Sequence, residues 1–122
     1  MNTRLRAAAI LDRVINQGQS LTAVLDQMLD TELKPQDKAF IQALCYGVLR
    51  YYPQLDFLLQ NLLGRPLKSK DNDIRILLLV GLYQLRFMRV KPHAAVAETV
   101  AAAGKKSWAK SLLNAVLTYL LI

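Results

Sequence analysis

Apolar residues recur along this chain with the period of an α-helix, and this periodicity constrains the fold more than any other feature. In the clearest stretch, seven side chains fall at offsets of 0, 1, 4, 5, 8, 9 and 12, namely Phe40, Ile41, Leu44, Cys45, Val48, Leu49 and Tyr52. These offsets place all seven on one face of a helix. No segment shows the sustained alternation of apolar and polar residues that marks a half-buried strand. The sequence therefore predicts an all-α protein.

Proline, glycine and capping residues divide the chain into seven predicted helices. The helices are expected at about residues 3–17, 20–30, 35–52, 53–63, 72–88 and 92–103, with a seventh from residue 107. The expected N-caps are Thr3, Ser20, Ser107 and either Asn72 or Asp73, because their side-chain oxygens can accept from free backbone N–H groups. Gly18 and Gly104 are the expected stops. Short connections between seven helices predict one compact domain over residues 1–122.

Two of the predicted helices carry expectations about the core. The helix at 72–88 is apolar nearly all round, so we expect it at the centre of the fold. The helix from residue 107 is expected to bury a single stripe, which consists of Trp108, Leu112, Ala115, Val116 and Tyr119.

The chain is basic, and its charge is uneven. The formal net charge is +7, with a balance of +1 over residues 1–50 and +6 over residues 51–122. A basic surface attracts polyanions, so nucleic acid is the favoured partner. The alternative that the protein is basic but binds no nucleic acid also stays open.

Four groups of cations are candidates for phosphate contacts. They are Arg6 with Arg13; Arg65, Lys68 and Lys70; Arg75, Arg86 and Arg89; and Lys105, Lys106 and Lys110. The spacing of the third group predicts that its arginines point within about 40° of one direction on their helix.

Residue combinations typical of catalysis or metal binding are missing. The sequence has one cysteine, one histidine and only isolated glycines, so no catalytic site and no metal site are predicted. Cys45 is expected to pack in the core as an unreactive thiol, and His93 to be neutral at a helix start. A lone cysteine, no signal-peptide pattern and apolar runs far below the ~20 residues of a membrane span predict a cytoplasmic protein without membrane contact.

Several motifs resemble the NusB-like domain family. They are Leu-Val-Gly-Leu-Tyr-Gln-Leu at 79–85 and Pro-His-Ala-Ala-Val-Ala-Glu-Thr-Val at 92–100, with further blocks at 44–50 and 113–117. Within this family the chain is most similar to the N-terminal domain of small-subunit ribosomal-RNA cytosine-5 methyltransferases. The similarity extends from about Arg4 to Leu120.

The resemblance implies a NusB-like bundle of two packed helical sub-bundles that binds ribosomal RNA. It also implies an RNA contact for the arginine-rich first helix, here Arg4, Arg6 and Arg13. The methyltransferases have a following catalytic domain with an S-adenosylmethionine site, which is expected to be missing from this chain. We therefore expect no cofactor in this fragment, S-adenosylmethionine in the missing domain, and that domain as a protein partner.

Two other functions remain open at the level of sequence. One is a free-standing transcription antitermination factor that binds RNA together with a protein. The other is a protein-docking module that uses the apolar end formed by Leu117, Leu120, Leu121 and Ile122. The amino-acid sequences of the motifs at 45–50 and 92–100 favour the methyltransferase over these two alternatives.

Overall fold

The computed structural model describes residues 2–29 and 31–121, and every regular element within these ranges is helical. The elements are α1 (Thr3–Ile15), α2 (Leu21–Met28), α3 (Pro35–Arg50), α4 (Tyr52–Leu62), the short 3-10 helix η1 (Ser69–Asp71), α5 (Asn72–Phe87), α6 (Pro92–Ala101) and α7 (Ser107–Tyr119). The predicted all-α fold with seven α-helices is confirmed.

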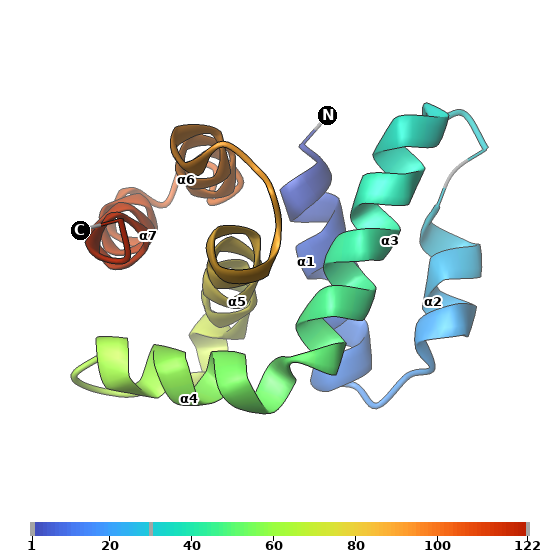
Figure 1. Ribbon diagram of the computed structural model, residues 1–122. Coiled ribbons are helices and arrows are strands. Elements are labelled where there is room, and N and C mark those ends of the chain that lie inside the picture. The colour runs from blue at the N-terminus through green and yellow to red at the C-terminus, as the bar shows by residue number, and fades with distance from the viewer. Residues whose placement is uncertain (1, 30, 122) are drawn as a thin grey trace.

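The helices form two packed groups that share one core (Figure 1). Helices α1, α2 and α3 make one group, and α4, α5, α6 and α7 make the other. Helix α5 joins them, because it contacts α1 and α3 on one side and α4, α6 and α7 on the other. Its side chains are buried nearly all round, including Ile76, Leu79 and Leu82 at 0% exposure. The predicted central position of this helix is confirmed.

Some predicted helix ends are confirmed, and others are shifted by one or two residues. Ser20 caps α2 through a hydrogen bond from the N–H of Ala23, and Gly18 and Gly104 adopt φ values of 68° and 66° where α1 and α6 have ended. Thr3, however, is the first residue of α1 rather than its cap. The described part of α2 ends at Met28, and its expected end at residue 30 lies outside the described residues.

Asn2 is the N-cap of α1, because its amide oxygen reaches two free donors of the first turn. The oxygen accepts from the N–H groups of Arg4 and Leu5 at 2.8 and 3.1 Å. Asparagine is among the strongest N-cap residues, and its side chain fits one position earlier than the threonine. Ser107 was likewise predicted one position too late, since Lys106 occupies the N-cap of α7 without a side-chain hydrogen bond. The prediction of Asn72 or Asp73 as the cap of α5 is also wrong, because Asp71 occupies that position.

The predicted buried stripe of α7 is wrong for Trp108, Ala115 and Tyr119, which are exposed, and is confirmed for Val116, which is buried. Its outermost members, Trp108 and Tyr119, are 47% and 65% exposed. Val116 shares the buried face with Ala109, Leu113 and Leu117, which were not in the predicted stripe. Leu117 packs directly over Gly81 of α5, where an added Cβ would lie 2.6 Å from the Leu117 Cδ1. This close helix crossing sets the rotation of α7 and turns the large aromatic rings outward.

Candidate nucleic-acid interface

Two arginines of α1 hold α2 in place. The Arg6 Nη1 donates to the Met28 carbonyl at 2.9 Å. The Arg13 Nε donates to Gln19 at 2.9 Å, and its Nη2 donates to Gln27 at 2.7 Å. The predicted shared face of these arginines is confirmed, and it points toward α2.

Arg4 takes part in an internal polar network. Its Nε donates to the Gln84 Oε1 at 2.9 Å, and its guanidinium lies 4.6 Å from the centroid of the Phe40 ring. Partial burial lowers the pKa of Arg4, and the negative charge of Glu98 opposes that shift. All three guanidinium groups of α1 thus have partners within the protein. An RNA contact by Arg4, Arg6 and Arg13 stays a prediction.

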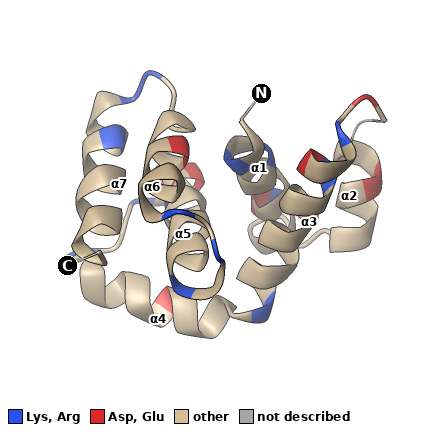
Figure 2. Ribbon diagram, turned by 45° about the horizontal axis from the view of Figure 1, so that its top comes forward, with Lys and Arg blue, Asp and Glu red and all other residues tan. Residues whose placement is uncertain are grey.

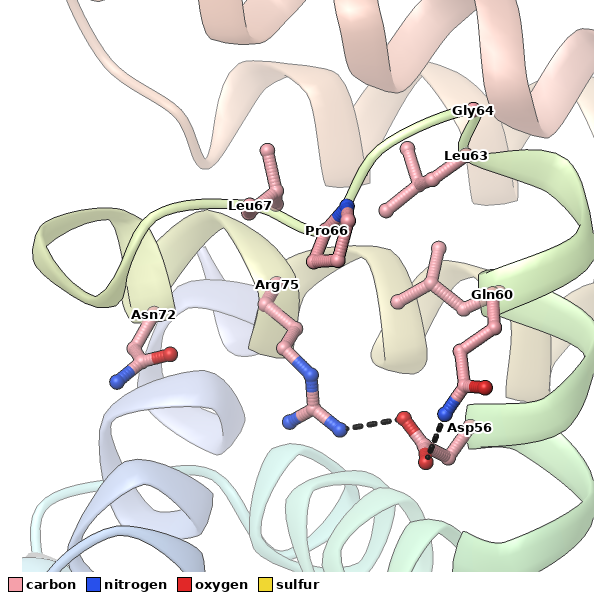
Figure 3. Close-up of a pocket in the computed structure, with 9 residues that line it drawn as sticks. Asp56, Gln60, Leu63, Gly64, Pro66, Leu67, Asn72 and Arg75 are labelled. Atoms are coloured by element: carbon pink, nitrogen blue, oxygen red, sulfur yellow. Dashed lines mark hydrogen bonds and ion pairs between the residues drawn. The ribbon is translucent and has the colours of Figure 1, made fainter.

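Arg75 faces a carboxylate rather than solvent (Figure 3). It lines a cavity of about 550 Å³ between α4, α5 and the loop between them, and its Nη2 lies 2.6 Å from both the Asp56 Oδ1 and the Tyr52 hydroxyl. Desolvation lowers the pKa of Arg75, but the hydrogen bonds to Tyr52 and Asp56 outweigh it and raise the pKa overall. Asp56 therefore neutralises the charge that was expected to face RNA.

The remaining arginines of this predicted group lie near the end of α5, and both are exposed. Helix α5 ends at Phe87, and Met88 is extended with φ −106° and ψ 158°, so Arg89 does not follow the helical spacing. The prediction that Arg75, Arg86 and Arg89 share one helical flank is therefore wrong for Arg89.

Two further exposed cations extend this region, and sequence reasoning did not single them out. They are Arg50 at the end of α3 and Lys91 before α6. Figure 2 shows basic segments at the end of α5, along the connection to α6 and at the end of α3. We refer to Arg50, Arg86, Arg89 and Lys91 as the α5–α6 cation group. The clustering of basic residues at 86–91 is the only sequence signal that indicates it.

Aromatic rings lie among these cations. The Tyr51 and Phe87 rings stack with centroids 4.1 Å apart and an interplanar angle of 10°. The Arg50 guanidinium lies 5.5 Å from the Tyr51 centroid, and Arg86 lines an apolar hollow of about 480 Å³ beside both rings. Exposed aromatic surface next to arginine is the combination with which proteins hold unstacked RNA bases. Sequence reasoning found no such aromatic set, because Tyr51 lies between α3 and α4 whereas Phe87 lies at the end of α5.

A second exposed basic region lies around the loop before α5. Arg65, Lys68 and Lys70 are all exposed and line a hollow of about 370 Å³ together with Trp108 of α7. We call this the Trp108 hollow. The predicted loop is confirmed for Arg65 and Lys68, whereas Lys70 lies in η1 directly after it.

The predicted group of lysines around the start of α7 separates into two locations. Lys105 and Lys106 lie in the exposed turn before the helix, and the Lys106 Nζ is 3.0 Å from the Asp73 Oδ2. Lys110 instead lines a shallow groove between α6 and α7, together with His93 and Asn114.

Cys45 has the properties expected of a packing residue. It is fully buried, its Sγ lies 3.8 Å from the Ala7 carbonyl, and desolvation raises the pKa of the thiol to about 12. Within residues 2–29 and 31–121, no three His, Cys, Asp or Glu side chains come together as a metal site. In the same ranges, no helix combines the length and apolarity needed to cross a membrane.

The predicted apolar docking end is only partly exposed. Leu117 is fully buried and Leu121 is 45% exposed. Ile122 lies outside the described residues.

Comparison with curated proteins finds close relatives that are considerably longer. Three of them are named ribosomal RNA small subunit methyltransferase B and come from Sodalis glossinidius, Pectobacterium carotovorum and Escherichia coli, with identities of 47%, 45% and 46%. Each match covers 118 residues, which is 95% of this chain and 27% of the relative.

A solved structure and a protein-family model also match this chain. The solved structure of T. maritima NusB superposes with a TM-score of 0.78 over 98% of this chain and 89% of that chain, at 17% sequence identity, which shows the shared fold. The sequence model of the NusB family matches residues 1–121. Since that match covers nearly the whole chain, the protein belongs to the NusB family.

Proposed function

We propose that this chain is an RNA-binding domain that holds small-subunit ribosomal RNA for a cytosine-5 methyltransferase. The names of its relatives, at 45–47% identity, supply the substrate class. The chain spans 27% of their length, so methyl transfer from S-adenosylmethionine is assigned to a catalytic domain that acts together with this one. Such a protein would work in the bacterial cytoplasm, which the single unpaired cysteine fits.

The observation that carries the proposal is the division of the cations into an internal and an external set. Arg4, Arg6, Arg13 and Arg75 donate to groups of the protein itself. The α5–α6 cation group and the cations of the Trp108 hollow are exposed. Two carboxylates of the same half of the molecule, Asp56 and Asp73, are paired with Arg75 and Lys106. The free positive charge is thus concentrated around α5, α6 and the start of α7.

Exposed cations can hold RNA without reading its sequence. Phosphate contacts release condensed counterions, so binding through them weakens as salt rises. Arginine adds planar, bidentate hydrogen bonds to phosphate oxygens. A domain of this kind fixes the position of the RNA while another domain performs the chemistry.

The proposal is tested by titrating a fragment of small-subunit ribosomal RNA with the chain at two salt concentrations. We expect a steep fall in affinity with salt, and a slope smaller by about one for each phosphate contact removed in the Arg86→Gln and Arg89→Gln variants. Lys34→Gln is the matched control, because Lys34 is exposed on the α1–α3 side. A flat salt response, or an equal loss in the control, contradicts the proposal.

The free-standing antitermination factor remains an alternative that rests on the shared fold alone. The T. maritima protein is only 17% identical, whereas the methyltransferases reach 47%. The methyltransferase relationship is therefore the better supported.

A further inference from the structure

We propose that the Trp108 hollow binds one unpaired nucleotide of an RNA strand. The base stacks on the Trp108 indole, while Arg65, Lys68 and Lys70 contact the adjacent phosphates. This inference rests on the proposed RNA-binding function and deepens it, because it assigns single-stranded RNA to a particular site.

Trp108 is oriented outward by the packing of its own helix. Its neighbour Ala109 is 0% exposed against the core, and Leu113, one turn later, is also fully buried. Trp108 itself is 47% exposed, although tryptophan is highly buried on average. The result is a large aromatic side chain presented at the rim of a hollow.

Three cations from a different part of the chain surround the same hollow. Arg65 and Lys68 come from the loop after α4, and Lys70 comes from η1. The loop has a defined path, because Pro66 and the half-buried Leu67 also line the cavity beneath it, and the N–H of Asp71 donates to the Lys68 carbonyl at 2.8 Å. The cations therefore have an ordered support.

The electrostatic balance of the hollow favours an anion. Asp71 is the one carboxylate among the residues that line it, against three cations. The next carboxylate along the chain, Asp73, is paired with Lys106. A phosphate entering the hollow therefore meets net positive charge.

An aromatic ring beside phosphate-binding cations distinguishes single strands from duplexes. Every base has a flat face that can stack on an indole, so such a site accepts any unpaired nucleotide. In an A-form duplex the bases are already stacked on each other, so no base face is free to stack on the indole. The hollow is thus expected to prefer loops and unpaired segments of RNA.

Trp108 is the only tryptophan in the sequence, so its fluorescence reports on this site directly. The experiment titrates the 122-residue chain with a dye-labelled, unstructured RNA of about 12 nucleotides, and separately with its duplex. Dye anisotropy measures binding, and tryptophan emission measures stacking. We expect quenching by the single strand, and duplex binding with little quenching.

Variants then test whether the indole contributes to affinity. Trp108→Leu is expected to weaken single-strand binding about tenfold, and Trp108→Tyr to retain most of it. The matched control is Tyr119→Leu, because Tyr119 is 65% exposed and lies eleven residues later on the same face of α7, away from the three cations. Circular dichroism verifies that each variant is folded.

The outcomes separate this inference from the function on which it rests. Salt-dependent RNA binding without quenching, together with unchanged affinity in Trp108→Leu, overturns the Trp108 site and leaves the RNA-binding domain intact. An equal loss in Tyr119→Leu also counts against the site. Absence of any anisotropy change with either RNA overturns both.

Discussion

At the scale of single residues, the Gln84 side chain ties three helices together. It is fully buried in α5, accepts a hydrogen bond from Arg4 of α1 at 2.9 Å, and donates to the Thr99 hydroxyl of α6 at 3.0 Å. Its amide also donates to the Val80 carbonyl at 3.1 Å. A buried polar group with all of these partners fixes the arrangement of the helices that supply them.

Replacing Gln84 with leucine is expected to lower the free energy of unfolding by about 1–3 kcal/mol, because Arg4 and Thr99 lose a buried partner. Urea denaturation followed by circular dichroism measures the change. Gln60→Leu is the control, since Gln60 also makes a hydrogen bond, to Asp56, but is exposed on α4. Equal changes in the free energy of unfolding for the two substitutions would show that the buried network stabilises the protein no more than an exposed hydrogen bond does.

The sequence identified which residues are basic but not which of them face solvent. Arg4 finds its acceptor 80 residues away at Gln84, and Arg6 finds one 22 residues away at Met28. Local spacing carries no information about such distant partners. The cations of the loop before α5 were grouped correctly, because their proximity follows from adjacency in the chain.

At the scale of whole helices, the crossing of α5 and α7 depends on the small size of Gly81. The Leu117 side chain occupies the space that a Cβ would need. A helical glycine normally destabilises its helix relative to alanine, so the contact it permits offsets that cost.

Gly81→Ala is therefore expected to destabilise the protein by about 1–3 kcal/mol through overpacking, although alanine is the better helix former. The thermal unfolding midpoint measures this. Gly64→Ala is the matched control, because no atom lies within 4 Å of the added Cβ and its φ is not positive. A Gly81→Ala variant that is as stable as the native chain would rule out the tight crossing.

The helices themselves were predictable, because their boundaries depend on residues at or near each helix end. Ser20, Pro35 and Gly104 act through their own backbone neighbours, so helix ends were found within a few residues. The buried face of α7 was not predictable in this way. That helix has apolar residues on more than one side, and the surface of α5 determines which of these sides is buried.

At the scale of the molecule, the two groups of helices share one continuous core. The buried cluster includes side chains from both groups, such as Ile10 and Leu44 in one and Leu78 and Leu113 in the other. Because α5 contacts helices of both groups, neither group can separate without exposing apolar surface of the other.

We therefore expect both groups to unfold in a single transition. Cys45 in α3 and Trp108 in α7 are each unique in the sequence, so pulsed thiol labelling and tryptophan fluorescence report on one group each. The raised pKa of Cys45 and its burial suppress labelling of the native thiol. Both probes should give the same urea midpoint, and clearly separated midpoints would indicate two independent units.

The position of α1 also has a consequence for biosynthesis. This helix packs against α3, α5 and α6, and the Asn2 amide donates to the Glu98 carbonyl at 2.9 Å. During translation α1 is made before α3, and α5 and α6 follow later still. The part of its apolar face that α5 covers therefore stays exposed until that helix is made, even after α2 and α3 have packed on the rest, and we expect a nascent-chain chaperone to engage this segment.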